Sequence, residues 1–136
     1  MVWYKKIFME KHSKEIKLIT HHKKSFDKKA MGYAKLTPNA VQEVNLDETK
    51  LTPRMIKEIV DELGIEINDI VDRDSDLFKN EYEGVDLSKD DWLKVLSEKS
   101  ELLKTPIVLS NNESFIVDTP SRLLEFREKY FKTETK

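Results

Sequence analysis

Apolar and polar positions in the first third of the chain predict a strand, a helix and a second strand. Residues 15–20, EIKLIT, form a short β-branched run bounded by charge, which is typical of a strand. The helix is predicted to begin at Ser25, whose hydroxyl would cap it, and to stop at LTPN, residues 36–39. Its apolar positions follow helical spacing at Phe26, Ala30, Met31 and Ala34. Residues 40–46 alternate valine with polar residues and predict the second strand.

The middle of the chain has the pattern of helices. In residues 51–64, Thr52 is a good helix cap, Pro53 suits the first helical position and Gly64 suits the end. Residues 66–84 predict short helical segments, and residues 88–99 predict another helix.

The last third predicts a hairpin and a final helix. Residues 106–110 and 113–118 are β-branched runs on either side of Asn111–Asn112, a turn pair. A helix follows Thr119–Pro120. The order βαβ, helical insert, ββα indicates an α/β fold with one mixed four-stranded sheet.

The length of 136 residues suits one domain. We assign it to residues 15–132, with an N-terminal extension at 1–14 and a tail at 133–136. The chain has no cysteine, which excludes disulfides, thiolate nucleophiles and Cys-ligated metal centres. No apolar run approaches the roughly 20 residues that span a bilayer, so we expect a cytoplasmic protein that does not enter the membrane.

Charge is unevenly distributed along the sequence. Residues 1–36 hold ten lysines against three acidic residues, whereas the whole chain has a net charge of -2. This basic third is either a solvated face or a surface that attracts an anionic partner. Nucleic acid is not an expected partner, because the remaining surface repels phosphate.

Three stretches carry a resemblance to a known family. They are LGIEINDIVDRDSDLFKN (63–80), LSKDDWLKVLSEKSELLKTPIVL (87–109) and TPSRLLEF (119–126). They resemble the arsenate reductase (ArsC) family and its relative, the transcriptional regulator Spx, and the resemblance extends over about residues 15–131. It implies a thioredoxin-like, glutaredoxin-like fold.

The resemblance also places an active-site loop at the first helix. The family's reactive cysteine falls on Ser25, and the loop before it falls on His21, His22, Lys23 and Lys24. A helix start lowers the pKa of a cysteine thiol, but a serine hydroxyl gains no comparable activation and needs a separate base. We therefore interpret Ser25 as a cap or an anion ligand, with a nucleophile as the alternative.

Arginines that hold the oxyanion in the family are largely replaced. Their positions fall on Thr105, near Asp118, and near Arg73, the one arginine still present. The resemblance further implies a cis peptide bond between Thr105 and Pro106, beside Ser25. The candidate ligand residues are therefore His21, His22, Lys23, Lys24, Ser25, Arg73, Thr105 and Pro106, and we assign no catalytic residue.

These residues leave several functions open. The first is a non-catalytic relative that binds a small oxyanion or a protein partner. The alternatives are an Spx-like regulator that docks on the transcription machinery and a residual oxidoreductase of unknown substrate. We predict no cofactor and no metal site, because adjacent His21 and His22 point to opposite faces of a strand end. The alternating Asp72, Asp74 and Asp76 lack the glycine and glutamate of a calcium loop.

Overall fold

A computed structural model describes residues 15–34, 40–111, 113–119 and 121–131 of the chain. The chain divides into two compact units. The sheet unit is formed by the parts up to Asp47 and from Thr105 onward, and the helical unit by Glu48–Lys104. The helical unit is the predicted insert. The extension at 1–14, the tail at 133–136 and the LTPN stop at 36–39 lie outside the described residues, and the extent of the domain stays a prediction.

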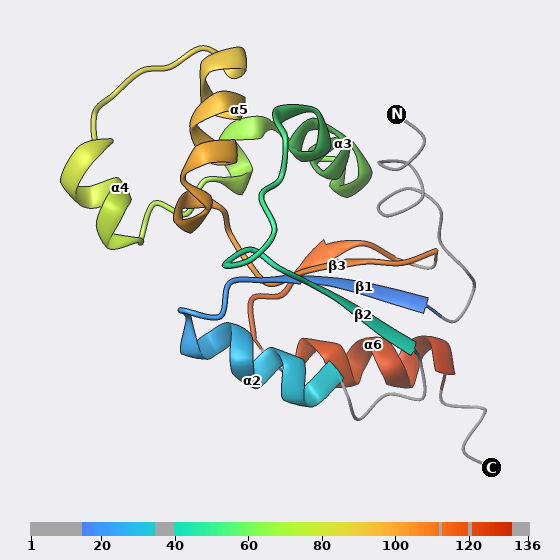
Figure 1. The fold of residues 1–136 in the computed structure, drawn as a ribbon. Coiled ribbons are helices and arrows are strands. Elements are labelled where there is room, and N and C mark those ends of the chain that lie inside the picture. Colours follow the sequence, from blue (N-terminus) through green and yellow to red (C-terminus); the bar gives the residue numbers. More distant parts are fainter. Residues whose placement is uncertain (1–14, 35–39, 112, 120, 132–136) are drawn as a thin grey trace. The chain divides into compact units, whose positions relative to one another are not determined.

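The sheet unit contains the predicted mixed sheet of four strands. These are β1 (Glu15–Thr20), β2 (Ala40–Asn45), β3 (Ile107–Leu109) and β4 (Phe115–Ile116), in the order β2-β1-β3-β4 (Figure 1). β1 pairs in parallel with β2 and antiparallel with β3, and β3 pairs antiparallel with β4. The sheet order and the βαβ and ββα connections confirm the predicted fold class.

Helices α2 (Ser25–Ala34) and α6 (Arg122–Phe131) cover one face of this sheet (Figure 1). Side chains alternate along β1, so Ile16 and Leu18 point toward these helices. The core between sheet and helices is formed by Ile16, Leu18, Ala30, Val108, Val117, Leu123 and Phe126. Burial of these apolar side chains fixes α2 against the end of β1, where the candidate loop lies.

The helical unit consists of α3 (Pro53–Leu63), η2 (Ile67–Ile70), α4 (Asp76–Glu81), α5 (Lys89–Glu98) and η3 (Ser100–Leu102). The α3 signals are confirmed: the Thr52 hydroxyl accepts from the Met55 N–H at 3.1 Å, and Gly64 ends the helix with φ 70°. Gly64 suits this position because the left-handed conformation is costly for other residues.

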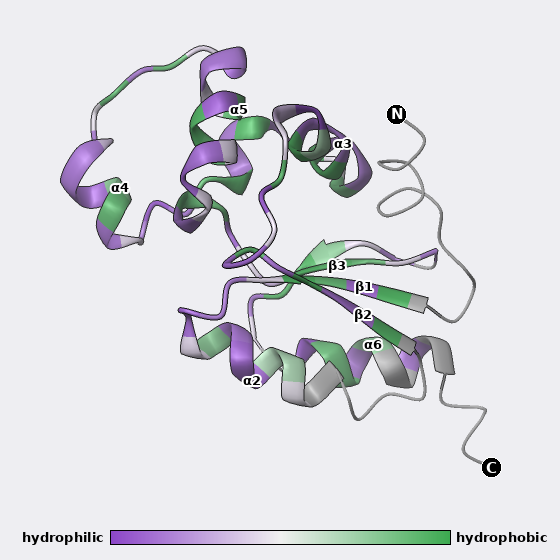
Figure 2. Cartoon of the chain, in the orientation of Figure 1, coloured by the Kyte–Doolittle hydropathy of each residue, from purple (hydrophilic) through white to green (hydrophobic). Residues whose placement is uncertain are grey.

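The core of the helical unit lies between α3 and α5, and both helices show apolar and polar sides in Figure 2. Its buried side chains include Met55, Ile56, Ile59, Trp92 and Leu96. Two backbone bonds join the end of η2 to the end of η3: the Asp72 N–H donates to the Leu102 oxygen at 2.7 Å, and the Lys104 N–H donates to the Ile70 oxygen at 2.8 Å. In the described residues we find no helix that is both long and apolar enough to cross a membrane.

Candidate functional site

The loop between β1 and α2 lies at one end of the sheet unit, and β3 brings a second segment to it. The Lys24 N–H donates to the His21 oxygen at 2.9 Å, which closes the turn before α2. Ile19 pairs with Ile107, so the residues just before Ile107 run beside those just after Ile19. Thr105 and Pro106 therefore lie next to the loop. The bond between them is cis, as the resemblance implied.

Ser25 does not cap α2, so this prediction is wrong. The Lys24 oxygen accepts from the Lys28 N–H at 3.4 Å, which makes Lys24 the cap and Ser25 the first helical residue. The cap role fails because the helix begins at Ser25 itself, so the capping position falls on Lys24. Ser25 is exposed, and within the described chain its hydroxyl has no hydrogen bond to either histidine. The arrangement gives this serine no base.

Asp27 lies in the first turn of α2, and its side chain connects the helix to the loop before it. Its side chain is buried, and its Oδ2 accepts from the His21 N–H at 2.7 Å. Its Oδ1 and the Thr105 hydroxyl oxygen are also buried, and neither has a hydrogen-bond partner of good geometry in the described part of the chain. Burial raises the pKa of Asp27, although the nearby Thr105 hydroxyl, the His21 N–H and Lys24 act in the opposite direction.

Both histidines of the loop contact carboxylates that come from β2 or follow it. His21 Nδ1 lies 3.1 Å from Asp47 Oδ1, and His22 Nε2 bonds to Glu43 Oε2. The same Glu43 oxygen accepts from the Thr20 hydroxyl at 2.8 Å. To bind an added anion, each imidazole would therefore have to give up its contact with a carboxylate.

The remaining positive charge of the loop comes from two lysines. Lys23 is exposed and Lys24 half-exposed, and both precede the exposed start of α2. Helix starts attract anions through their backbone N–H groups and the helix dipole. Negative charge opposes this attraction, because Asp27, Glu43 and Asp47 also lie at the site.

The other candidate residues are distributed as follows. His21, His22, Lys23, Lys24, Ser25, Thr105 and Pro106 all belong to the sheet unit, whereas Arg73 belongs to the helical unit. There its guanidinium lies 5.2 Å from the centre of the Phe78 ring. Among the described residues, no group of three or more His, Asp or Glu side chains is arranged to hold a metal ion.

Sequence reasoning did not identify the three carboxylates of the site. Asp27 could have been noticed, because it lies three and four residues before Ala30 and Met31 and so falls on the apolar stripe of α2. A carboxylate on a buried stripe signals a specific hydrogen bond. Glu43 and Asp47 carry no such signal, because their contacts depend on the pairing of β1 with β2.

The fold of the chain is that of solved arsenate reductase structures. An arsenate reductase from Vibrio cholerae aligns with a TM-score of 0.73 and 22% identity, over 84% of this chain and 98% of that chain. An arsenate reductase (ArsC) related protein from Brucella melitensis aligns with a TM-score of 0.62 and 11% identity, over 90% and 99%. No protein-family model and no curated protein matches the sequence.

These likenesses show that the chain has an α/β fold of the thioredoxin-like type. The fold is that of the arsenate reductase structures, and in this chain a helical segment separates β2 from β3.

Proposed function

We propose that this protein is a non-catalytic member of the thioredoxin-like class that binds a small oxyanion at the start of α2. The observation that carries the proposal is Ser25. It is the exposed first residue of a ten-residue helix, it follows two lysines, and it stands where the resemblance places a cysteine. Phosphate, sulfate and carboxylate are the anions that this arrangement suits.

Loss of thiol chemistry is the second part of the proposal. The chain contains no cysteine, so its own residues offer no thiolate to attack an oxyanion or to form a disulfide. Thr105 also lacks the positive charge that the family places there. A residual oxidoreductase of unknown substrate would need a different nucleophile, and among the described residues neither histidine is hydrogen-bonded to the Ser25 hydroxyl.

The carboxylates of the site limit its affinity. Asp27, Glu43 and Asp47 oppose the two lysines, and Glu43 and Asp47 already contact the imidazoles. The attraction left for an anion comes from the backbone N–H groups of the helix start and from Lys23 and Lys24. We therefore expect binding in the millimolar range.

Titration with phosphate, followed by the amide NMR signals of residues 21–26, tests the oxyanion site. We expect saturable shifts that are largest at Ser25 and Phe26. Lys23→Gln should weaken binding, whereas Lys29→Gln, an equal loss of charge in the second turn of α2, should change it little because the attraction of a helix start falls off within the first turn. Absence of shifts in the millimolar range, or equal weakening by both variants, would contradict the site.

A regulator that docks on a protein partner, as Spx does on RNA polymerase, is the second candidate. It is favoured by the charges of the two units. The sheet unit has fifteen basic and ten acidic residues, whereas the helical unit has nine basic and sixteen acidic residues. Opposite charges of this size favour electrostatic association with a partner. Pull-down from the native host at low and high salt tests this: polymerase subunits retained only at low salt support it, and their absence at both contradicts it.

The cytoplasmic location belongs to this proposal as well. Fractionation of the host should recover the protein with cytoplasmic markers, and recovery with the membrane fraction would contradict that location.

A further inference from the structure

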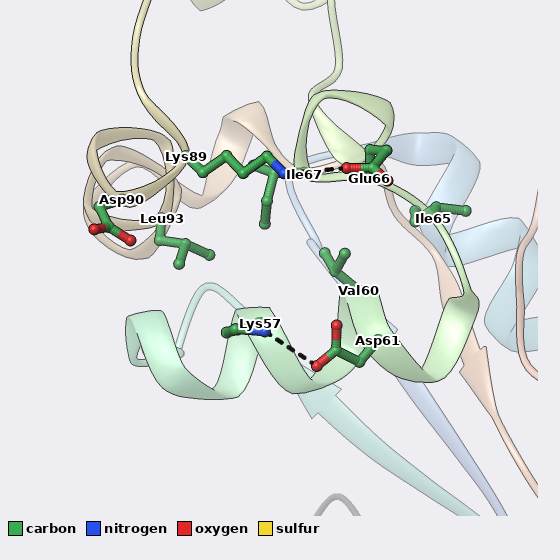
Figure 3. Close-up of a pocket in the computed structure, with 9 residues that line it drawn as sticks. All are labelled: Lys57, Val60, Asp61, Ile65, Glu66, Ile67, Lys89, Asp90 and Leu93. Atoms are coloured by element: carbon green, nitrogen blue, oxygen red, sulfur yellow. Dashed lines mark hydrogen bonds and ion pairs between the residues drawn. The ribbon is translucent and has the colours of Figure 1, made fainter.

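The helical unit contains a small cavity that the oxyanion site does not involve. It has a volume of about 230 Å³ and lies between α3, α5 and the segment that leads into η2 (Figure 3). Val60, Ile67 and Leu93 supply apolar walls. Val60 and Ile67 are buried, whereas Leu93 is half-exposed. The cavity therefore offers an apolar surface that solvent can reach.

Two ion pairs flank this apolar surface on opposite sides, as the dashed lines in Figure 3 show. Lys57 Nζ lies 3.3 Å from Asp61 Oδ2, and Lys89 Nζ lies 3.5 Å from Glu66 Oε1. The side chains of the second pair are 77% and 75% exposed. Exposed pairs of this kind contribute about 0–1 kcal/mol, so their partners exchange at little cost.

The size and charge of the cavity restrict its ligand. Its volume is below the roughly 300–1,000 Å³ of pockets for drug-sized molecules, so it accommodates a smaller molecule. Each of the two ion pairs presents one cation and one anion close together, and Asp90 adds a third carboxylate to the lining. A simple anion or a simple cation would meet a like charge at either ion pair. A ligand that carries both charges can instead place each of them against the opposite charge of a pair.

We propose that this cavity binds a small aliphatic α-amino acid as its zwitterion. The ligand carboxylate contacts Lys89 and the ligand ammonium contacts Glu66, so that both charges of the exposed pair are compensated. The aliphatic side chain packs on Val60 and Leu93, which removes apolar surface from water. Binding at this site is independent of the oxyanion proposal, because it uses residues of the helical unit only.

NMR titration of the whole protein with L-leucine tests the proposal. We expect saturable shifts of the Val60, Ile67 and Leu93 methyl signals in the millimolar range. Three probes each lack one feature of leucine: 4-methylpentanoate has no ammonium, isopentylamine has no carboxylate, and glycine has no aliphatic side chain. Each should bind at least about tenfold more weakly than leucine.

Two charge reversals distinguish a contact at the cavity from a general effect of the protein's net charge on leucine binding. Lys89→Glu places two carboxylates at the proposed contact and should weaken leucine binding, whereas Lys79→Glu makes the same charge change on α4, outside the cavity lining. Both side chains are exposed, so both variants should fold, which circular dichroism checks. Absence of leucine shifts, equal affinity for isopentylamine or 4-methylpentanoate, or equal weakening by both variants would overturn the proposal.

Discussion

Asp27 is the residue whose replacement tests the structure of the site most closely. Asp27→Ala removes the acceptor of the His21 N–H, which is buried and bonded at 2.7 Å. A buried donor left without a partner costs about 1–3 kcal/mol, so we expect this variant to lose stability by that amount. Asp27→Asn keeps an acceptor oxygen and adds an N–H that can donate to the Thr105 hydroxyl. Its stability at neutral pH should lie within about 1 kcal/mol of the wild type.

Comparing the stability of Asp27→Asn with that of the wild type at different pH values reveals the titration of Asp27. Its pKa in the folded protein is raised above the ordinary value of 3.8, so between these two values the folded state binds more protons than the unfolded state. The contribution of Asp27 to stability is therefore largest at low pH and is lost as pH rises through the folded pKa. The stability of Asp27→Asn relative to the wild type should increase across that window and stay constant above it.

Urea unfolding followed by far-UV circular dichroism at a series of pH values measures both effects. Subtracting the wild-type free energy of unfolding from that of Asp27→Asn cancels the other titrating groups. The reasoning is refuted if Asn is as destabilising as Ala, since the acceptor role then fails. It is also refuted if the difference decreases as pH rises, since the pKa would then be lowered by folding.

Three further substitutions test other parts of the account. Ser25→Cys should give a thiol with a pKa below about 8.5, because it stands at a helix start, whereas Lys94→Cys within α5 should not; the pH dependence of alkylation rates measures both. Leu18→Ala, in a fully buried position, should cost about 2–5 kcal/mol in urea unfolding, and a loss below 1 kcal/mol would contradict the core. Gly64→Ala at φ 70° should cost about 1–2 kcal/mol, and an unchanged melting temperature would contradict this C-terminal cap.

Elements with strong local signals were predictable from the sequence. Thr52, Pro53 and Gly64 act within one helix, and the structure has all three in their predicted roles. β1 at Glu15–Thr20 was likewise defined by its β-branched run. The cis bond before Pro106 came from the resemblance and not from any local pattern.

The candidate site was less predictable, because its contacts depend on tertiary structure. The cap at Ser25 failed because α2 begins at Ser25 itself, which leaves the capping position to Lys24. Glu43 and Asp47 reach the two histidines only once β2 has paired with β1 in its observed register. Local propensity does not encode such pairings, so the histidines looked available for a ligand when they already contact carboxylates.

One experiment tests the central claim, which is that the start of α2 binds an oxyanion but does not reduce it. Arsenate is added to isotope-labelled protein with a thiol reductant, and the amide signals of residues 21–26 and the arsenite formed are measured together, against a sample without protein. We predict saturable shifts at Ser25 and Phe26 while arsenite stays at the background level. Arsenite above background, or unchanged amide signals, would contradict the account.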